Sequence, residues 1–323
     1  MEDEKAVAEG ASGLSQPESV TGSPKGIFVG EGGLRSGWRL LIYVLMVLGV
    51  SFAIGVAIQL LFHTRRGLPG VWAQLAQEVV GFAVAFGAAV VMSRIEHRSL
   101  GVYGLPAKEM FASKFWLGFL FGLLEITVLI GLITTFGGYS FGPLALHGDK
   151  ILLWGLFHLA MFTFVGLFEE FLFRGYMQYT LGDGIGFWPA AVILSFLFGG
   201  AHLGNPGEGW VGAASVVLIA LFFCFSLKRT GNLWYAVGLH ASFDWGETYL
   251  YSVPNSGTFM DGHLSNAVLQ SGPKWLTGGS IGPEGSVFCF FTILLQFLVV
   301  MWLFPAQKSE SAVTQSQSLL EGK

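Results

Sequence analysis

Charged residues are scarce in this sequence. Only 12% of its 323 residues are Asp, Glu, Lys or Arg, and 53% are hydrophobic, whereas an average soluble domain has about 25% charged residues. This deficit excludes an ordinary soluble protein and predicts a chain that crosses a lipid bilayer several times. The net charge of −4 gives no basic surface, so we expect no nucleic-acid partner.

Further absences narrow the class of protein. Only two cysteines are present, Cys224 and Cys289, both in apolar segments, which indicates small buried side chains rather than a disulfide or a metal pair. Residues 1–25 are polar and lack the apolar core of a cleaved signal peptide. No internal repeat is visible, so an inverted-repeat transporter has little support.

Long apolar segments dominate what remains. A bilayer-spanning helix needs about 20 apolar residues, and about eight segments approach that length. They lie at about residues 38–62, 71–93, 115–136, 151–181, 187–203, 210–227, 232–251 and 286–304. We therefore predict an all-α fold, a polytopic transmembrane helical bundle.

The same pattern divides the chain into three parts. Residues 38–304 are expected to form the transmembrane helical domain, preceded by a disordered cytoplasmic segment at 1–37 and followed by a polar tail at 305–323. Within the domain, the loop 252–285 is rich in Gly, Pro, Ser and Asn and is expected to cover the outer face. The sequence does not indicate an oligomeric state.

Lys and Arg in the short connections predict the orientation. With the N-terminus in the cytoplasm, most basic residues fall on the inner side, whereas Arg65, Arg66, Lys150 and Lys274 fall on the outer side. Positive charge is enriched in cytoplasmic loops of membrane proteins. Both termini of this integral multi-pass protein are therefore expected in the cytoplasm.

The segment F-E-E-F-L-F-R-G-Y, residues 168–176, places three ionisable side chains in an apolar helix. Each costs about 2.5–3.5 kcal/mol at the centre of a membrane helix on insertion scales. Glu170 and Arg174 are four residues apart and can pair, whereas Glu169 is rotated about 100° away and is free to face a cavity. A purely structural network of all three is the alternative.

Two histidines follow in later apolar segments. His202 lies four residues after Phe198, and His240 lies four residues before Asp244, which can orient the imidazole. A carboxylate in apolar surroundings can act as a general base on water, and a histidine–carboxylate pair can donate to an oxyanion. The constellation indicates hydrolysis of an amide bond inside a membrane cavity. Taken alone, each histidine also fits a structural role.

Two more acids, Glu78 and Glu125, stand alone in apolar helices. We interpret both as structural, because intramembrane acids usually face the interior of a helix bundle. Glu78 is expected to form a polar stripe with Gln74 and Gln77 against a neighbouring helix.

Three motifs occur in order within the core segment 151–251. They are E-E-x-x-x-R (Glu169, Glu170, Arg174), F-x-x-x-H (Phe198, His202) and H-x-x-x-D (His240, Asp244). In this order they resemble the motifs of the CAAX protease and bacteriocin-processing family of intramembrane proteases. The connector R-S-L-G-V-Y-G-L at residues 98–105 is similar to that of bacterial members. The resemblance implies an eight-helix endopeptidase of a bacterial inner membrane, with a peptide or membrane-protein substrate and no cofactor.

The resemblance also implies a role for each motif residue. Glu169 would activate water with help from His202, and His240 and Asp244 would bind the oxyanion. Glu170, Arg174 and Phe198 would support them. The eukaryotic Ras-processing members carry Asn at the last position, and an ionised aspartate would repel an oxyanion. Asp244 is therefore expected either to be protonated or to act only by orienting His240.

Other classes of protein stay open at this point. A zinc-dependent membrane hydrolase would use His202, His240 and Glu169 as ligands, although the sequence has no H-E-x-x-H motif. A non-enzymatic membrane scaffold or immunity protein would keep the polar site for binding. A proton-coupled transporter would use intramembrane Glu and His as a proton relay.

Overall fold

The structure is a computed structural model, and it describes residues 26, 28–30, 33–61, 70–270 and 272–306. The α-helices are α2 (Ser36–Leu61), α3 (Gly70–Ile95), α4 (Ser113–Thr135), α5 (Asp149–Glu170), α6 (Gln178–Ile185), α7 (Phe187–His202), α8 (Trp210–Thr230), α9 (Trp234–Trp245), α10 (Lys274–Thr277) and α11 (Val287–Leu303). Two π-helices, η3 (Phe171–Met177) and η4 (Gly246–Leu250), continue α5 and α9. Short 3₁₀ turns are η1 (Leu100–Tyr103), η2 (Ala107–Glu109) and η5 (Pro283–Gly285).

The predicted all-α membrane bundle is confirmed. Among the described residues, five helical segments are long and apolar enough to cross a membrane, at 36–60, 70–95, 113–135, 149–185 and 210–230. Two shorter apolar helices, α7 and α11, coincide with the fifth and eighth predicted segments. The fourth predicted segment is longer than expected, because η3 joins α5 to α6 in one run of 37 residues.

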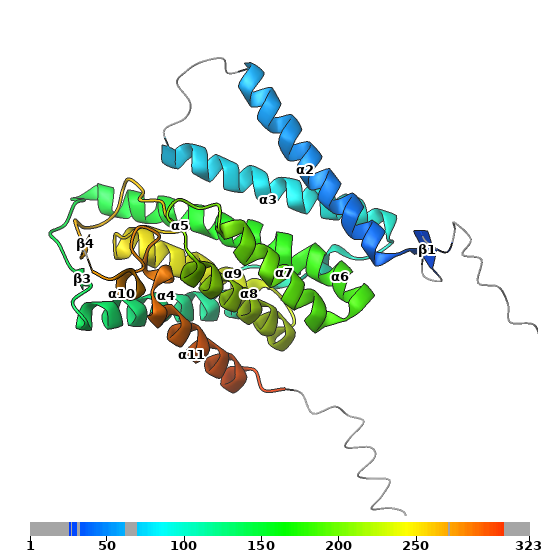
Figure 1. Cartoon of the computed structure of the whole chain (residues 1–323). Helices are drawn as coiled ribbons and strands as arrows, with labels where there is room; N and C mark the ends of the chain where they lie inside the picture. Colours follow the sequence, from blue (N-terminus) through cyan, green and yellow to red (C-terminus); the bar gives the residue numbers. More distant parts are fainter. Residues whose placement is uncertain (1–25, 27, 31–32, 62–69, 271, 307–323) are drawn as a thin grey trace, which may run out of the picture.

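Helix α9 lies inside the bundle (Figure 1). It packs against α4 on one side and against α5 on the other, and it also contacts α8. Helix α3 covers α5, and α2 lies outermost and diverges from α3 (Figure 1). Helix α11 packs on α4 and α8. The central position of α9 matters because this helix carries His240 and Asp244.

Glycines allow α4 and α9 to approach closely. A Cβ atom at Gly118 of α4 would overlap the carbonyl oxygen of Tyr235, and one at Gly122 would overlap that of Leu239. From the other side, a Cβ at Gly238 of α9 would overlap the Phe115 carbonyl oxygen. Small residues drive helix association in membranes because they allow backbone-to-backbone packing. These glycines therefore fix where α9 stands relative to α4.

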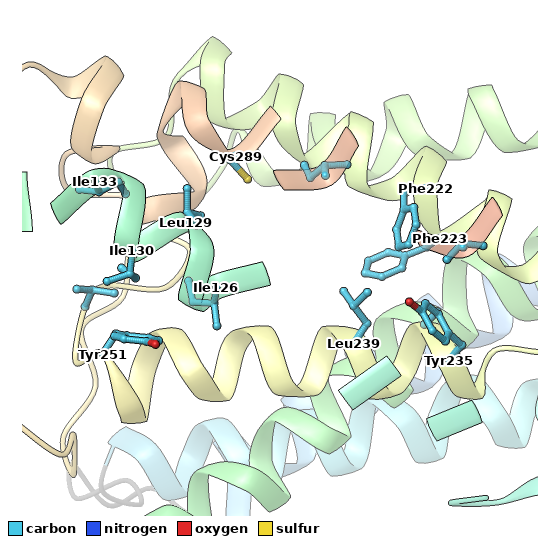
Figure 2. Packing of buried hydrophobic residues seen from close by; sticks show 14 of the residues in the cluster. Ile126, Leu129, Ile130, Ile133, Phe222, Phe223, Tyr235, Leu239, Tyr251 and Cys289 are labelled. Carbon is cyan, nitrogen blue, oxygen red and sulfur yellow. The ribbon is translucent and has the colours of Figure 1, made fainter. Parts of the chain in front are cut away.

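Apolar side chains of α4, α8, α9 and α11 form the largest core cluster (Figure 2). Phe223 of α8 lies beside Leu239 of α9, and Ile126 and Leu129 of α4 lie farther along the cluster, toward Cys289. Cys289 of α11 is a free, buried thiol in this cluster, as its apolar surroundings in the sequence predict.

Helix α2 begins and α11 ends at the same end of the bundle (Figure 1). Ion pairs join the elements there. Arg39 binds Glu96 at 2.8 Å and Asp183 at 3.0 Å. Tyr176 donates to the Glu96 carboxylate. This network ties α2 and α3 to α6, which follows the π-helix η3.

Short β ladders flank the bundle. Strand β1 (Val29–Gly30) pairs with β2 (Gly33–Leu34). These residues and the first turn of α2 lie within the segment 1–37, for which the composition predicts disorder. The structure differs there, because the ladder and a hydrogen bond from Arg35 N to Phe28 O order these residues. The other predictions for 1–25 and 307–323 lie outside the described residues. Strands β3 (Tyr139–Ser140) and β4 (Val268–Leu269) pair at the opposite end, in the region of the loop 252–285.

Candidate active site

The acidic pair Glu169–Glu170 closes α5, where the helix changes to the π-helix η3. Gly175 departs from helical geometry inside η3, with ψ −107°. A Cβ atom on Gly175 would press against the Phe171 ring and the Tyr103 carbonyl oxygen. π-Helical turns are often found at functional sites, because they turn a side chain out of its regular register. Arg174 lies within this turn, four residues after Glu170.

Glu170 lies at the centre of a buried polar chain. Its side chain is fully buried, and Oε1 lies 3.2 Å from Arg174 NH1 and 3.0 Å from His240 Nδ1. The i, i+4 contact is the one that the sequence spacing predicts. The contact to His240 joins α5 to α9 and has no counterpart in the sequence pattern.

Three aromatic rings surround the Arg174 guanidinium. Its carbon lies 4.3 Å from the ring centroid of Phe198, 5.5 Å from that of Phe223 and 5.8 Å from that of Phe173. Ring faces attract cations, and more strongly where water is excluded. Phe198 therefore supports the site through Arg174 as well as through its position before His202.

His240 stands among three carboxylates. Its Nδ1 faces Glu170, whereas Nε2 lies 3.7 Å from Glu169 Oε2 and 3.5 Å from Asp244 Oδ2. The imidazole stacks on Phe223, with the centroids 5.5 Å apart. Carboxylates on both nitrogens favour a doubly protonated ring, since each nitrogen then has a hydrogen to donate. The contact to Glu170 is shorter than that to Asp244, so Glu170 also holds the ring, and the expectation that Asp244 orients it stays a prediction.

His202 ends α7 and lines the same cavity. Its Nδ1 lies 2.8 Å from the carbonyl oxygen of Phe198, and a carbonyl oxygen can only accept. In the neutral ring Nδ1 therefore holds the hydrogen, and Nε2 is left as an acceptor. The hydrogen bonds and ion pairs between the described residues do not join His202 to Glu169 directly.

The four predicted reactive side chains all line one cavity of about 370 Å³. They come from three helices, Glu169 from α5, His202 from α7, and His240 and Asp244 from α9. The Glu169 side chain is 27% exposed, against 0% for Glu170. The neighbouring carboxylates thus differ as the sequence predicts, with Glu169 open to the cavity and Glu170 closed in protein. The catalytic roles assigned to these residues stay predictions.

Three further carboxyl groups line the cavity and were not predicted as site residues. They are Glu78 of α3, Glu125 of α4 and Glu284 of the loop before α11. Burial, and to a smaller extent the nearby charge of Asp244, raise the pKa of Glu284 to about 8. The interpretation of Glu78 and Glu125 as structural residues does not explain why both side chains line the cavity. A lone acid in an apolar helix was the only signal available for either.

The side chains of the cavity include residue types that can bind metal ions. Over the part of the chain that the structure describes, no group of three or more His, Cys, Asp or Glu residues is arranged to hold a metal ion. His202, His240 and Glu169, the ligands considered for zinc, line one cavity but do not converge as a ligand set. Metal independence therefore stays a prediction.

Carboxylates and imidazoles that face one cavity inside apolar helices define an intramembrane acid–base site. Comparison with known proteins extends this description. A protein-family model described as "Type II CAAX prenyl endopeptidase Rce1-like" matches residues 151–246. The matched segment runs from α5 to the end of α9 and contains all seven motif residues named above.

This segment is similar to the CAAX protease family, and the match supports a CAAX-protease-like hydrolase acting on peptide bonds. No curated protein matches the chain, and no solved structure matches it. Glu78, Glu125 and Glu284 lie outside the matched segment, so the family match assigns them no role.

Proposed function

We propose that the protein is an intramembrane endopeptidase in which Glu169 activates water. The observation that carries this proposal is the convergence of Glu169, His202 and His240 on one cavity from three separate helices. The family match over residues 151–246 supports the same reaction class. The substrate would be a peptide or a segment of a membrane-associated protein.

Glu169 has the position of the general base. Its carboxylate opens to the cavity, and His202 offers Nε2 as a second acceptor in the same space. A water molecule between them would donate one hydrogen to each, which leaves its oxygen lone pair free to attack a carbonyl carbon. Glu169 takes the proton as the carbon–oxygen bond forms.

His240 has the position of the oxyanion donor. Nδ1 donates to Glu170, so Nε2–H is the hydrogen that can reach the cavity. It would donate to the carbonyl oxygen as negative charge develops there. Asp244, 3.5 Å from Nε2, would keep the ring protonated and would compete with the oxyanion if it were ionised. Transfer of the proton from Glu169 to the amine nitrogen breaks the peptide bond, with one water consumed.

A purified, detergent-solubilised protein and a peptide library test this function. Glu169→Gln keeps the size of the side chain and removes the base, so cleavage should fall by about 10²–10⁴-fold. Glu208→Gln removes a carboxylate whose Oε1 accepts from Gly209 N at the start of α8 and serves as the matched control. Cleavage by the Glu169→Gln variant at the wild-type rate contradicts the proposed function.

A further inference from the structure

Asn255 is a buried amide on the wall of the cavity. It lies in the loop that follows the π-helix η4, is 7% exposed and lines the same cavity as Glu169 and His240. Its amide interacts with the Asp244 carboxyl group, yet Nδ2 makes no hydrogen bond of regular geometry with another described residue. An amide nitrogen carries two hydrogens, and the contact to Asp244 engages one of them. The other hydrogen is left for a ligand.

A tight turn fixes the position of this amide. Thr258 N donates to the Asn255 carbonyl oxygen at 2.8 Å, and the two central residues, Ser256 and Gly257, have φ of 46° and 79°. Positive φ at both central residues defines a type I′ turn, and it is uncommon for a residue such as serine. Here Ser256 N donates to Glu284 Oε1 at 2.6 Å, which holds the turn in this conformation. Asn255 is therefore in place before a ligand arrives.

Asn255 and His240 face the same carboxyl group from different elements. His240 Nε2 lies 3.5 Å from Asp244 Oδ2, and the Asn255 amide meets that carboxyl group from the loop. Because both donors reach one small group, they are neighbours on the cavity wall. A substrate oxygen that accepts from His240 Nε2 then lies near Asn255 as well.

The charges around His240 make a second donor necessary. Its Nδ1 is engaged by Glu170, so a single N–H of the ring is left, with Glu169 and Asp244 beside it. Negative charge that develops on a carbonyl oxygen there is opposed by these neighbouring carboxylates. Sites that stabilise an oxyanion use donors fixed in advance, among them the side-chain amides of Asn and Gln. The amide of Asn255 is neutral, so it donates without needing a proton from solution.

Other polar side chains on the cavity wall are less suited to this task. Ser215 has one hydroxyl hydrogen, and two backbone carbonyl oxygens already lie 2.7 and 2.8 Å from its Oγ. Gln74 and Asn205 also carry amides, but both are only partly buried, so water competes for their hydrogens. Asn255 combines an amide, burial and a place next to His240.

We propose that Asn255 is a further catalytic residue, which donates from Nδ2 to the carbonyl oxygen of the bond that is cut. Together with His240 it stabilises the negative charge that develops there, and it keeps both of its own hydrogens throughout. This role rests on the proposed function, although binding can be measured without turnover. Asn255 lies outside residues 151–246, so the family match assigns it no role.

The test measures binding and cleavage by the protein in detergent. The probes are acetylated and amidated apolar hexapeptides in which a difluoroketone replaces the central peptide bond, and the same peptides with a methylene group in place of the ketone carbonyl. The hydrated ketone resembles the tetrahedral intermediate, so the wild-type protein should bind it more tightly than the methylene peptide.

Asn255→Ala should lower this ratio of affinities at least about tenfold, because it removes a donor to the oxygen that only the ketone carries. For a library peptide that the wild type cleaves, kcat should fall by about 10²–10³-fold with KM little changed. Asn266→Ala removes an exposed amide from the same loop. This matched control should change neither quantity.

Repeating the binding comparison in an Asp244→Ala protein separates direct action from action through Asp244. Asn255→Ala should lower the ratio there as well, and a fall that disappears without Asp244 overturns the proposal by making Asn255 a positioning residue. An unchanged ratio in the Asn255→Ala protein also overturns it. So does a wild-type protein that binds no ketone more tightly than its methylene partner. Asn255→Leu, which has a similar shape and no N–H in its side chain, replaces the Ala variant if the latter does not fold.

The two proposals fail separately in this design. An Asn255-dependent preference for the ketone, without cleavage of any library peptide by the wild-type protein, retains the donor site and rejects the endopeptidase. Cleavage by the Asn255→Ala protein at the wild-type rate does the reverse.

Discussion

The buried pair Glu170–Arg174 allows a quantitative test of what the polar side chains beneath the cavity do. We would replace Arg174 by Met, Glu170 by Gln, and both together. Met fills most of the space of Arg without its charge, and Gln keeps an oxygen that can accept from His240 Nδ1. The three variants separate the loss of the pair from the exposure of one unpaired charge.

The structure sets the size of the effect. The two charges are 3.2 Å apart, with 1% and 0% of the side chains exposed, so they attract each other by about 5 kcal/mol at an effective dielectric constant of about 20. Removing one partner of a buried pair typically costs about 3–5 kcal/mol, because the other charge stays buried. Loss of the contact between Arg174 and Phe198 adds up to about 2 kcal/mol.

We expect each single variant to lose about 3–5 kcal/mol of the free energy of unfolding. The double variant should recover most of this loss, because a neutral pair leaves no charge uncompensated. Unfolding in mixed micelles with increasing denaturing detergent, followed by tryptophan fluorescence, measures all three differences. The wild-type protein in the same micelles is the reference.

Two results would refute this reasoning. A double variant no more stable than the single ones would show that the pair is not what compensates the charges. A fully stable Arg174→Met protein that had lost peptide cleavage would place Arg174 in the chemistry rather than in the support of the fold.

Other predictions follow from the site and the topology. If Glu169 and His202 act on one water, the effects of Glu169→Gln and His202→Ala on cleavage should not add, and a double variant with the product of both losses argues against a shared water. Strong chelators should leave cleavage intact, and stoichiometric zinc whose removal abolishes cleavage and whose return restores it would instead support the zinc hydrolase. Reporter fusions at Lys308 and in the loop 252–285 should lie on opposite sides of the membrane, with Lys308 in the cytoplasm. Glu284 has its pKa raised from 4.5 to about 8 by burial, so its contribution to stability is fully present below pH 4.5 and is lost as the pH rises through about 8. Melting temperatures from pH 5 to 9 should therefore fall more for the wild type than for Glu284→Gln.

The sequence pattern predicts contacts within one helix well. Glu170 with Arg174, and His240 with Asp244, are four residues apart, and both pairs are in contact. The positions of the apolar segments also follow from length and composition alone, since a bilayer demands a minimum apolar length.

Contacts between helices were not predictable in the same way. A soluble helix shows its inward face as an apolar stripe, but these helices are apolar on all sides, so the sequence does not reveal which side of α3 or α4 faces inward. Glu78 and Glu125 were therefore given structural roles, although both line the cavity. The contact between Glu170 and His240 depends on how α5 packs against α9, which does not follow from residue spacing.

The glycine contact between α4 and α9 has a consequence for how a substrate arrives. Backbone lies close to backbone at Gly118, Gly122 and Gly238, so these two helices cannot take up larger side chains at these points without moving apart. Close packing at the glycines is therefore expected to keep α4 and α9, which carries His240, at a fixed separation. A peptide that enters from the lipid is therefore expected to pass elsewhere, and α2, which lies outermost and diverges from α3 (Figure 1), can shift without disturbing α4 and α9.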